Sequence, residues 1–230
     1  MPTRRSLRVL AAFLLASLPL LTALPVVAAD PPRFRAELPL LDSIDVIVRD
    51  RSVLAVSAET GAHASRAKLE LGEDVLWVGV RGRIGLVVTN RRLLAISRTA
   101  PVWQFVYFKA RETMPRSILL GERVGLVATS HHLYGITAAG GLLKKRELSP
   151  YETVMDDLVA ENLAVIVTDR RLIGLSGFAG GFFEEGIGVH EDLDYASISA
   201  DFATVATDRR LVVFDAESGD WQSRQLGVRD

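Results

Sequence analysis

The sequence predicts an all-β protein built from five similar antiparallel sheets, and three observations support this. A ten-residue segment recurs five times, beginning at residues 48, 88, 128, 167 and 206. Each copy lies in a unit of 39 or 40 residues that contains four short apolar or alternating segments separated by turn residues. Glycine and β-branched residues are plentiful, and long runs of helix formers are scarce. Four-stranded repeats of this length are typical of blades stacked around an axis, so we expect a five-bladed β-propeller of four-stranded antiparallel blades.

The second strand of each unit indicates why the sheets should stack. The segments IGLVVT (84–89) and LAVIVT (163–168) are apolar at consecutive positions, so both faces of such a strand must be buried. A sheet that lies between two similar sheets provides this environment. The third strands, such as RLIGLS (171–176), follow directly after a short charged turn.

The first and fourth strands of the units are less regular. The first strands should be small and apolar, and we expect them at 37–41, 75–80, 117–122, 157–162 and 196–201. The fourth strands should be more polar and begin with a bulky residue, and we expect them at 103–108, 142–148, 182–186 and 221–226. Because bulky residues recur at equivalent places in these strands, we expect them in the sheet cores: Trp103, Leu143, Phe182 and Trp221, with His63 in the first unit.

The N-terminus resembles an export signal. Three arginines precede an apolar run over residues 9–29, and Ala28 and Ala29 offer cleavage sites for a signal peptidase. The run is long enough to span a bilayer, so an uncleaved N-terminal anchor is the alternative. We therefore expect a signal peptide at 1–29 and the propeller at 30–230, with the mature protein in the periplasm or secreted.

Composition excludes several classes of site and partner. The chain contains no cysteine, which excludes disulfides, thiolate zinc sites and a cysteine nucleophile. Without residues 1–29 the chain keeps 24 basic and 28 acidic side chains, so net charge does not favour nucleic acid. We predict no metal and no cofactor, membrane contact only through an uncleaved N-terminal segment, and a monomer.

Two segments carry a family resemblance. VLAVSAETGAH (53–63) and LVVFDAESGDWQ (211–222) resemble the blade repeat of the pyrroloquinoline-quinone-type and outer-membrane-assembly propellers, in which a strand ending in Asp or Ser leads through a small-residue turn towards a Trp. Glu59, Thr60 and Gly61 match that turn, and so do the residues at 217–219. The resemblance implies the repeat class. It does not imply quinone binding, because the dedicated ligands of those larger enzymes are absent.

The turns between second and third strands form a basic rim. Two interpretations remain open: a site for a small anionic or glycan ligand or an acidic peptide, and a structural role in which the arginines pair with acidic connections at 71–75, 110–113, 154–157 and 190–194 to link neighbouring blades. Adjacent histidines replace the arginines in the third unit and break the repeat. The candidate binding residues are Arg51, Arg91, Arg92, His131, His132, Arg170, Arg171, Arg209 and Arg210.

Evidence for catalysis is thin, and we predict no catalytic residue. His131 and His132 are neighbours on a strand and point to opposite faces, so they cannot both bind one metal ion. Acidic residues recur just before the second strands at Glu122, Glu161 and Asp201, where turn formation accounts for them. A hydrolase or lyase acting on a glycan at the rim is the alternative function.

The sequence therefore favours an exported module that binds or scaffolds other molecules in the cell envelope. The unusually apolar outer strand WQFVYFK (103–109) predicts a contact with a protein partner. Ring closure has two possible forms. The first and last blades pack side by side, or RFRAEL (33–38) adds an outer strand to the last blade.

Overall fold

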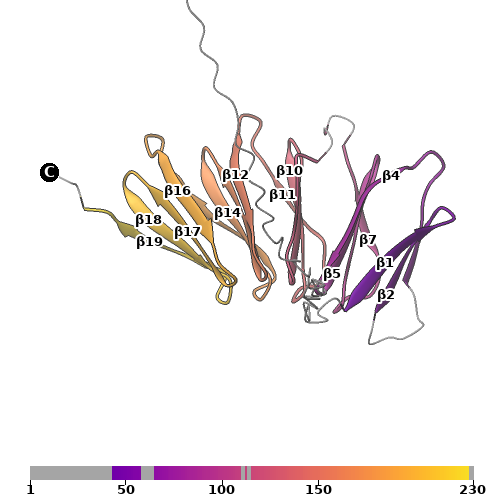
Figure 1. Ribbon diagram of the computed structural model, residues 1–230. Coiled ribbons are helices and arrows are strands. Elements are labelled where there is room, and N and C mark those ends of the chain that lie inside the picture. The colour runs from indigo at the N-terminus through magenta and orange to yellow at the C-terminus, as the bar shows by residue number, and fades with distance from the viewer. Residues whose placement is uncertain (1–42, 58–64, 110–111, 113–114, 228–230) are drawn as a thin grey trace, which may run out of the picture. The chain divides into compact units, whose positions relative to one another are not determined.

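The computed structural model describes residues 43–57, 65–109, 112 and 115–227. The predicted signal peptide, the strand expected at 37–41, the turn at 59–61 and His63 lie outside these residues. The described residues form 19 β-strands and no helix (Figure 1). They contain no helical segment with the length and apolar character needed to cross a bilayer.

The strands make five antiparallel sheets, each built from consecutive strands. The first sheet comprises β1 (Ile44–Arg49), β2 (Ser52–Ser57) and β3 (Ser65–Lys68). The second comprises β4 (Val75–Arg81), β5 (Ile84–Thr89), β6 (Arg92–Ser97) and β7 (Gln104–Tyr107). The third comprises β8 (Ser117–Leu120), β9 (Val124–Ala128), β10 (His132–Thr137) and β11 (Lys144–Glu147). The fourth comprises β12 (Val154–Val159), β13 (Leu163–Thr168), β14 (Arg171–Ser176) and β15 (Gly181–Gly186). The fifth comprises β16 (Leu193–Ile198), β17 (Phe202–Thr207), β18 (Arg210–Asp215) and β19 (Asp220–Gln225).

The strand predictions agree well in the middle of each unit and less well at its start. The predicted strands 84–89, 163–168 and 171–176 coincide with β5, β13 and β14. The first strands of the fourth and fifth sheets begin three residues earlier than predicted. Each contains an irregularity in its pairing, at Val154–Asp156 and at Leu193–Tyr195. The first strand of the second sheet has a similar irregularity at Val75–Trp77, yet it begins where it was predicted.

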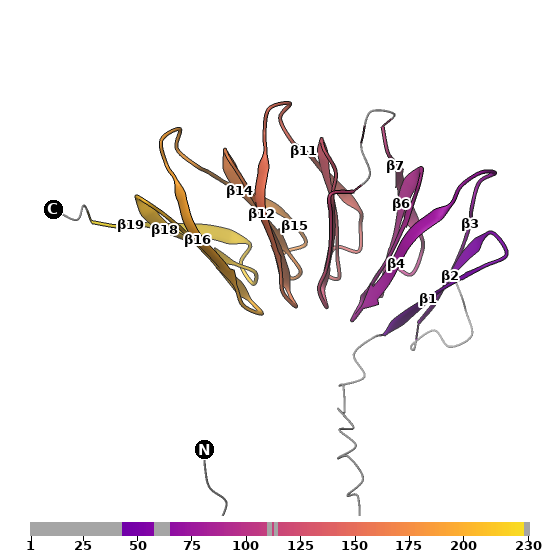
Figure 2. The ribbon, with the colours of Figure 1, turned by 45° about the horizontal axis from the view of Figure 1, so that its top comes forward.

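Neighbouring sheets pack face to face in chain order, and Figure 2 shows the first and fifth sheets at opposite ends of the series. Four apolar clusters fill the four spaces between consecutive sheets. Every residue of β5, β9 and β13 is buried, because each of these strands belongs to a sheet with a neighbour on both faces. The sequence-based inference that second strands bury both faces is therefore confirmed for the three middle sheets.

The turns between first and second strands also link each sheet to the next. Arg83 donates its backbone N–H to the carbonyl of Glu122 at 2.9 Å, and Arg123 donates to Glu161 at 2.8 Å. Asn162 makes the corresponding bond to Ala200, and its side chain donates to the carboxylate of Asp201 at 2.6 Å. The acidic residues predicted to serve turns at these positions therefore lie in linking turns.

Bulky side chains fit against small residues of the neighbouring sheet. Phe214 is fully buried against Gly174, where a Cβ atom would lie 2.6 Å from its ring. Trp103 and Trp221 donate their indole N–H to carbonyls of the preceding sheet's last strand, at Ser65 and Phe183, both at 3.1 Å. The expectation that Trp103, Leu143, Phe182 and Trp221 belong to the sheet cores is confirmed, since each packs in one of the four clusters.

The turn of the first sheet has a backbone strain that the other four turns lack. Asp50 and Arg51 have φ values of 48° and 58°. In the other units a threonine hydroxyl accepts hydrogen bonds from the two turn amides that follow, whereas Arg49 occupies that position in the first unit. Two consecutive positive φ angles favour Asn-Gly in a two-residue hairpin.

Replacing Asp50 with Asn and Arg51 with Gly should stabilise the protein by about 1 kcal/mol, since residues suited to positive φ remove part of the strain. Chemical denaturation measures the change. Arg91→Gly is the matched control, because the turn of the second sheet has no positive φ and glycine there adds only unfolded-state entropy. The two variants should shift stability in opposite directions, and equal shifts would contradict this explanation.

Candidate functional site: the charged rim clusters

The second sheet shows what the basic rim residues do. Arg92 is 5% exposed and grips the carboxylate of Glu73 with two nitrogens, Nε at 2.8 Å from Oε1 and Nη2 at 2.9 Å from Oε2. Thr89 Oγ1 lies 2.9 Å from the same Oε1. Nη2 of Arg92 also donates to the carbonyl of Lys68 at 2.7 Å, at the end of the preceding sheet's last strand. One guanidinium thus closes a buried cluster and links two sheets.

The same cluster recurs in the fourth and fifth sheets. Arg171 Nε lies 2.8 Å from Glu152, and its Nη2 donates to the carbonyl of Glu147 in the third sheet at 2.8 Å. Arg210 Nε lies 2.7 Å from Glu191, and its Nη2 donates to the carbonyl of Gly186 in the fourth sheet. These bonds confirm, for the arginines at the start of the third strands, the inference that arginines link neighbouring sheets.

Electrostatics hold these carboxylates ionised. Burial disfavours the charged form of Glu191, but the Arg210 guanidinium, the Gly188 amide and the Thr207 hydroxyl outweigh it and lower its pKa to about 2. The pKa values of Glu73 and Glu152 are lowered by equivalent partners against the same opposing effect of burial. Hydrogen bonding to these carboxylates raises the pKa of each paired arginine.

The third sheet carries a variant of the cluster. His132 replaces the arginine, is 1% exposed, and places Nδ1 2.5 Å from Glu112 Oε1. The Tyr134 hydroxyl lies 3.0 Å from both carboxylate oxygens, and Thr129 donates to the same group at 2.9 Å. Burial and the hydrogen bond to Glu112 raise the pKa of Tyr134. Four donors, with the amide of Lys109 included, thus surround a carboxylate that has no guanidinium.

The first sheet lacks the basic member of the cluster. Ser52 stands where the other units have arginine or histidine, and it lies next to the guanidinium of Arg66 at 2.8 Å. A serine side chain is too short to reach a preceding sheet.

The structure therefore divides the nine predicted rim residues into two groups. Arg92, His132, Arg171 and Arg210 belong to the clusters, while the other five lie on the turns. Among those five, Arg91 pairs with Glu70 at 3.3 Å, Arg209 lies 3.7 Å from Asp208, and His131 contacts the Ser130 hydroxyl at 2.7 Å. The anion-binding hypothesis stays a prediction, and its accessible members are Arg51, Arg91, His131, Arg170 and Arg209.

The acidic connection predicted for the fourth unit was wrong. It was expected at residues 154–157, whereas the carboxylate that pairs with Arg171 is Glu152. The signal that would have found it is spacing. The pairing glutamate precedes the cluster threonine by 16 residues in the second, fourth and fifth sheets and by 17 in the third.

The outer edge of the second sheet exposes aromatic side chains. Phe105 and Tyr107 on β7 are 54% and 47% exposed, and their rings pack edge to face with centroids 5.7 Å apart. The Arg92 guanidinium lies 5.1 Å and 5.6 Å from the two ring centroids. The strand β7 is an edge of its sheet, so its outer backbone groups are not paired within the sheet.

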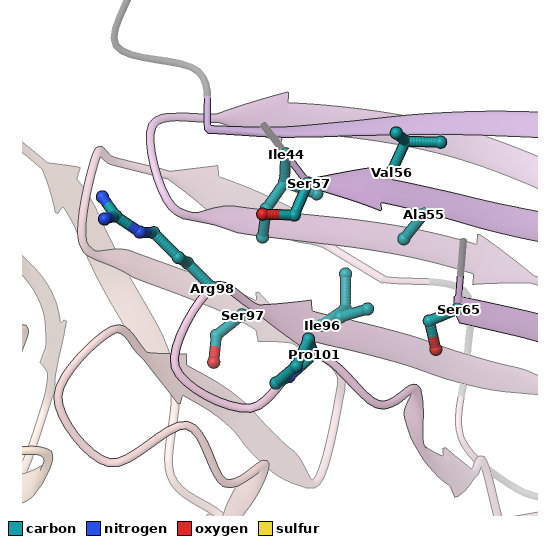
Figure 3. Close-up of a pocket in the computed structure, with 9 residues that line it drawn as sticks. All are labelled: Ile44, Ala55, Val56, Ser57, Ser65, Ile96, Ser97, Arg98 and Pro101. Carbon is teal, nitrogen blue, oxygen red and sulfur yellow. The ribbon is translucent and has the colours of Figure 1, made fainter. Parts of the chain in front are cut away.

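The described part of the chain contains a small pocket between two sheets and wider, open hollows at the surface. The pocket between the first two sheets, near Ile44, Ser57 and Pro101 (Figure 3), has a volume of about 10 Å³ and holds at most a water molecule. Wider hollows of about 830 Å³ and 500 Å³ lie open at the fifth-sheet rim beside Arg209 and along the outer strand with Lys144. Within the described ranges no three metal-ligating side chains gather into a candidate metal site.

Comparisons with known proteins identify distant likenesses. No family model and no curated protein matches the chain. Among solved structures, the N-terminal domain of Nup159 is 11% identical with a TM-score of 0.31, over 80% of this chain and 58% of that one. The Neurospora crassa Pan2 WD40 domain is 13% identical with a TM-score of 0.30, over 80% and 62% of the two chains. PorZ, a bacterial surface component of the Porphyromonas gingivalis type-IX secretion system, is 13% identical with a TM-score of 0.35, over 80% and 27%. This chain thus spans less than two thirds of these structures, and such low TM-scores assign neither a fold family nor a function.

Proposed function

We propose that the chain is an exported binding and scaffolding module of the cell envelope, in which the five repeats act as the blades of a β-propeller-type array. It binds a protein partner through the edge of the second sheet. The exposed aromatic pair on the edge strand β7, Phe105 and Tyr107, carries this proposal.

Aromatic side chains beside an open strand edge are suited to protein recognition. A partner strand can pair with the free backbone groups of β7, while the rings contribute apolar contact area. Arg92 holds the two rings from one side, so their conformation is largely set before a partner arrives. Preorganised aromatic residues and arginine are the residue types that dominate binding energy at protein interfaces.

The charges at the rim support a scaffold over the alternative of a glycan-active enzyme. A glycosidase needs two carboxyl groups that face a substrate across the scissile bond. The buried carboxylates here face arginine, histidine and threonine of their own clusters and have lowered pKa values. A general acid needs the opposite, a carboxyl group with a raised pKa.

Site-specific photo-crosslinking tests the partner surface. With a photoreactive residue in place of Phe105, we expect a discrete cross-linked product with another protein in intact cells. Lys144 is the matched control position, because β11 is the equivalent outer strand of the third sheet and carries exposed basic residues. Cross-linking at neither position, or equally at both, would refute the assignment of the surface to β7.

Export is tested separately with a reporter fusion. Residues 1–35 joined to an enzyme that becomes active only after disulfide formation outside the cytoplasm should yield activity. Replacing Leu14 and Leu15 with arginine interrupts the apolar run and should abolish that activity. An inactive wild-type fusion that accumulates in the cytoplasm would contradict export while leaving the binding surface untouched.

A further inference from the structure

The first and fifth sheets each have one face that no neighbouring described sheet covers. The strands β1 and β17 contain exposed as well as buried residues, whereas β5, β9 and β13 are buried throughout. Figure 2 shows these two sheets at the ends of the series. A ring that closes on itself would require the two free faces to pack against each other.

The free face of the first sheet lacks two features that pack the other sheets against a preceding sheet, a small residue in the second strand and a basic residue at the start of the third. The second residue of each second strand is small where it meets the preceding sheet, and a Cβ atom on Gly85 would lie 2.9 Å from Val46. Strand β1 of the three-stranded first sheet corresponds to the second strands of the other sheets. Its second residue is Asp45, which is exposed. Ser52 also replaces the arginine that would reach across. The equivalent small residues are Gly85, Gly125, Ala164 and Ala203.

The free face of the fifth sheet lacks the small residue that would make room for a side chain of a following sheet. A small residue in the middle of each third strand receives a side chain from the next sheet, as Gly174 receives Phe214 and Gly135 receives Phe182. In the fifth sheet Val213 fills this position. Neither free face therefore provides the interface that joins the four consecutive pairs of sheets.

The free face of the fifth sheet is nevertheless apolar at its centre. The side chains of β18 alternate, with Val212 and Phe214 fully buried towards the fourth sheet, so Leu211 and Val213 face the other way. Pairing places Thr204 beside Val213 and Ala206 beside Leu211 on the same face. Tyr195 and Phe202 extend this patch and are 59% and 49% exposed.

The charges that border this patch are arranged so that two copies of the same face can pair opposite charges. On β19, Trp221 packs towards the fourth sheet, so Asp220, Gln222 and Arg224 lie on the free face with opposite charges at the two ends. A two-fold axis in the plane of the interface and across the strands would reverse the strand direction of a second copy. Each Asp220 would then oppose the partner's Arg224, with Gln222 at the axis.

We propose that the free face of the fifth sheet binds the same face of a second copy of this chain, so that the array dimerises instead of closing on its own first sheet. This departs from the monomer expected from sequence, because the sequence alone does not show that one sheet of the series keeps an uncovered apolar face. This surface lies on the fifth sheet and the β7 edge on the second, so the dimer and the partner-binding proposal are tested independently.

Analytical ultracentrifugation over a range of protein concentrations tests the dimer, with the protein purified in the form that the cell produces. The wild-type protein should pass from monomer to dimer as concentration rises. Asp220→Arg and Arg224→Asp each place like charges opposite one another twice per dimer and should raise the dissociation constant at least about tenfold. The double variant Asp220→Arg/Arg224→Asp restores opposite charges and should return the dissociation constant towards that of the wild type.

A matched pair of apolar positions locates the interface. Val213→Glu should abolish the dimer, whereas Val56→Glu, on the free face of the first sheet, should leave it intact. Circular dichroism confirms that each variant is folded, and the two exposed charge variants provide the test if Val213→Glu is not. A wild-type protein that stays monomeric, a dimer broken by Val56→Glu alone, or failure of the double charge variant to recover would overturn the proposal.

Discussion

The Glu73→Gln variant is expected to lose about 3–5 kcal/mol of unfolding free energy, because it leaves a buried guanidinium without its counter-charge. Arg92 and Glu73 are among the buried residues, and the guanidinium makes two hydrogen bonds to the carboxylate. Loss of the carboxylate also loosens the link to Lys68 in the first sheet. Urea denaturation at neutral pH measures the change.

Glu70→Gln is the matched control for this prediction. Glu70 lies in the same connection, but its ion pair with Arg91 is exposed, with a separation of 3.3 Å. Exposed pairs contribute at most about 1 kcal/mol, so the control should be nearly neutral. The double variant Glu73→Leu/Arg92→Leu should be less destabilised than Glu73→Gln, since no buried charge remains unpaired. Equal losses for Glu70→Gln and Glu73→Gln would show that burial of the pair is not what matters.

Acid should destabilise the protein over a defined pH window. The folded-state pKa values of Glu73, Glu112, Glu152 and Glu191 all lie below the usual value for glutamate. The stability that each carboxylate contributes is therefore complete above its unfolded pKa of about 4.3. It is lost as pH falls towards the folded pKa, which is about 2 for Glu191. Stability should change little from pH 7 to about pH 5 on account of these groups and decline steeply below about pH 4.

Unfolding free energy measured as a function of pH checks this window. Glu191→Gln removes one of the four groups and should reduce the slope between about pH 4 and pH 2. The control Glu217→Gln changes an exposed residue of the same sheet and should leave the slope unchanged. A wild-type profile that stays flat down to pH 2, or a slope that Glu191→Gln does not alter, would contradict the assigned role of these carboxylates.

Sequence periodicity was a reliable guide to the sheets because it reports backbone requirements that every repeat shares. The run of apolar residues in LAVIVT (163–168) requires burial of both faces, and β13 is buried at every position. Bulges are a different matter. The irregularity at Leu193–Tyr195 depends on how β16 meets β17, and a single strand does not display it.

For the charged rim, the sequence did not predict which individual side chains are buried and paired. The repeated arginines and acidic connections indicated pairing, but residue type alone could not separate Arg92, which is buried, from Arg91, which is exposed one position earlier. Nor did proximity in sequence identify Glu152, which lies outside the expected segment 154–157. Both assignments depend on which side chains a folded turn directs inwards.

The sequence by itself determined the all-β class, the five repeated units and the strands that bury both faces. Those properties follow from spacing and polarity, which each repeat carries within its own residues. Only the tertiary structure decided which faces remain uncovered, which arginines link neighbouring sheets, and which carboxylates those arginines bind. The physical reason is that burial of a face depends on the presence of a neighbouring sheet, and departures from the repeat such as Asp45 and Val213 can be interpreted only once the packing order of the sheets is known.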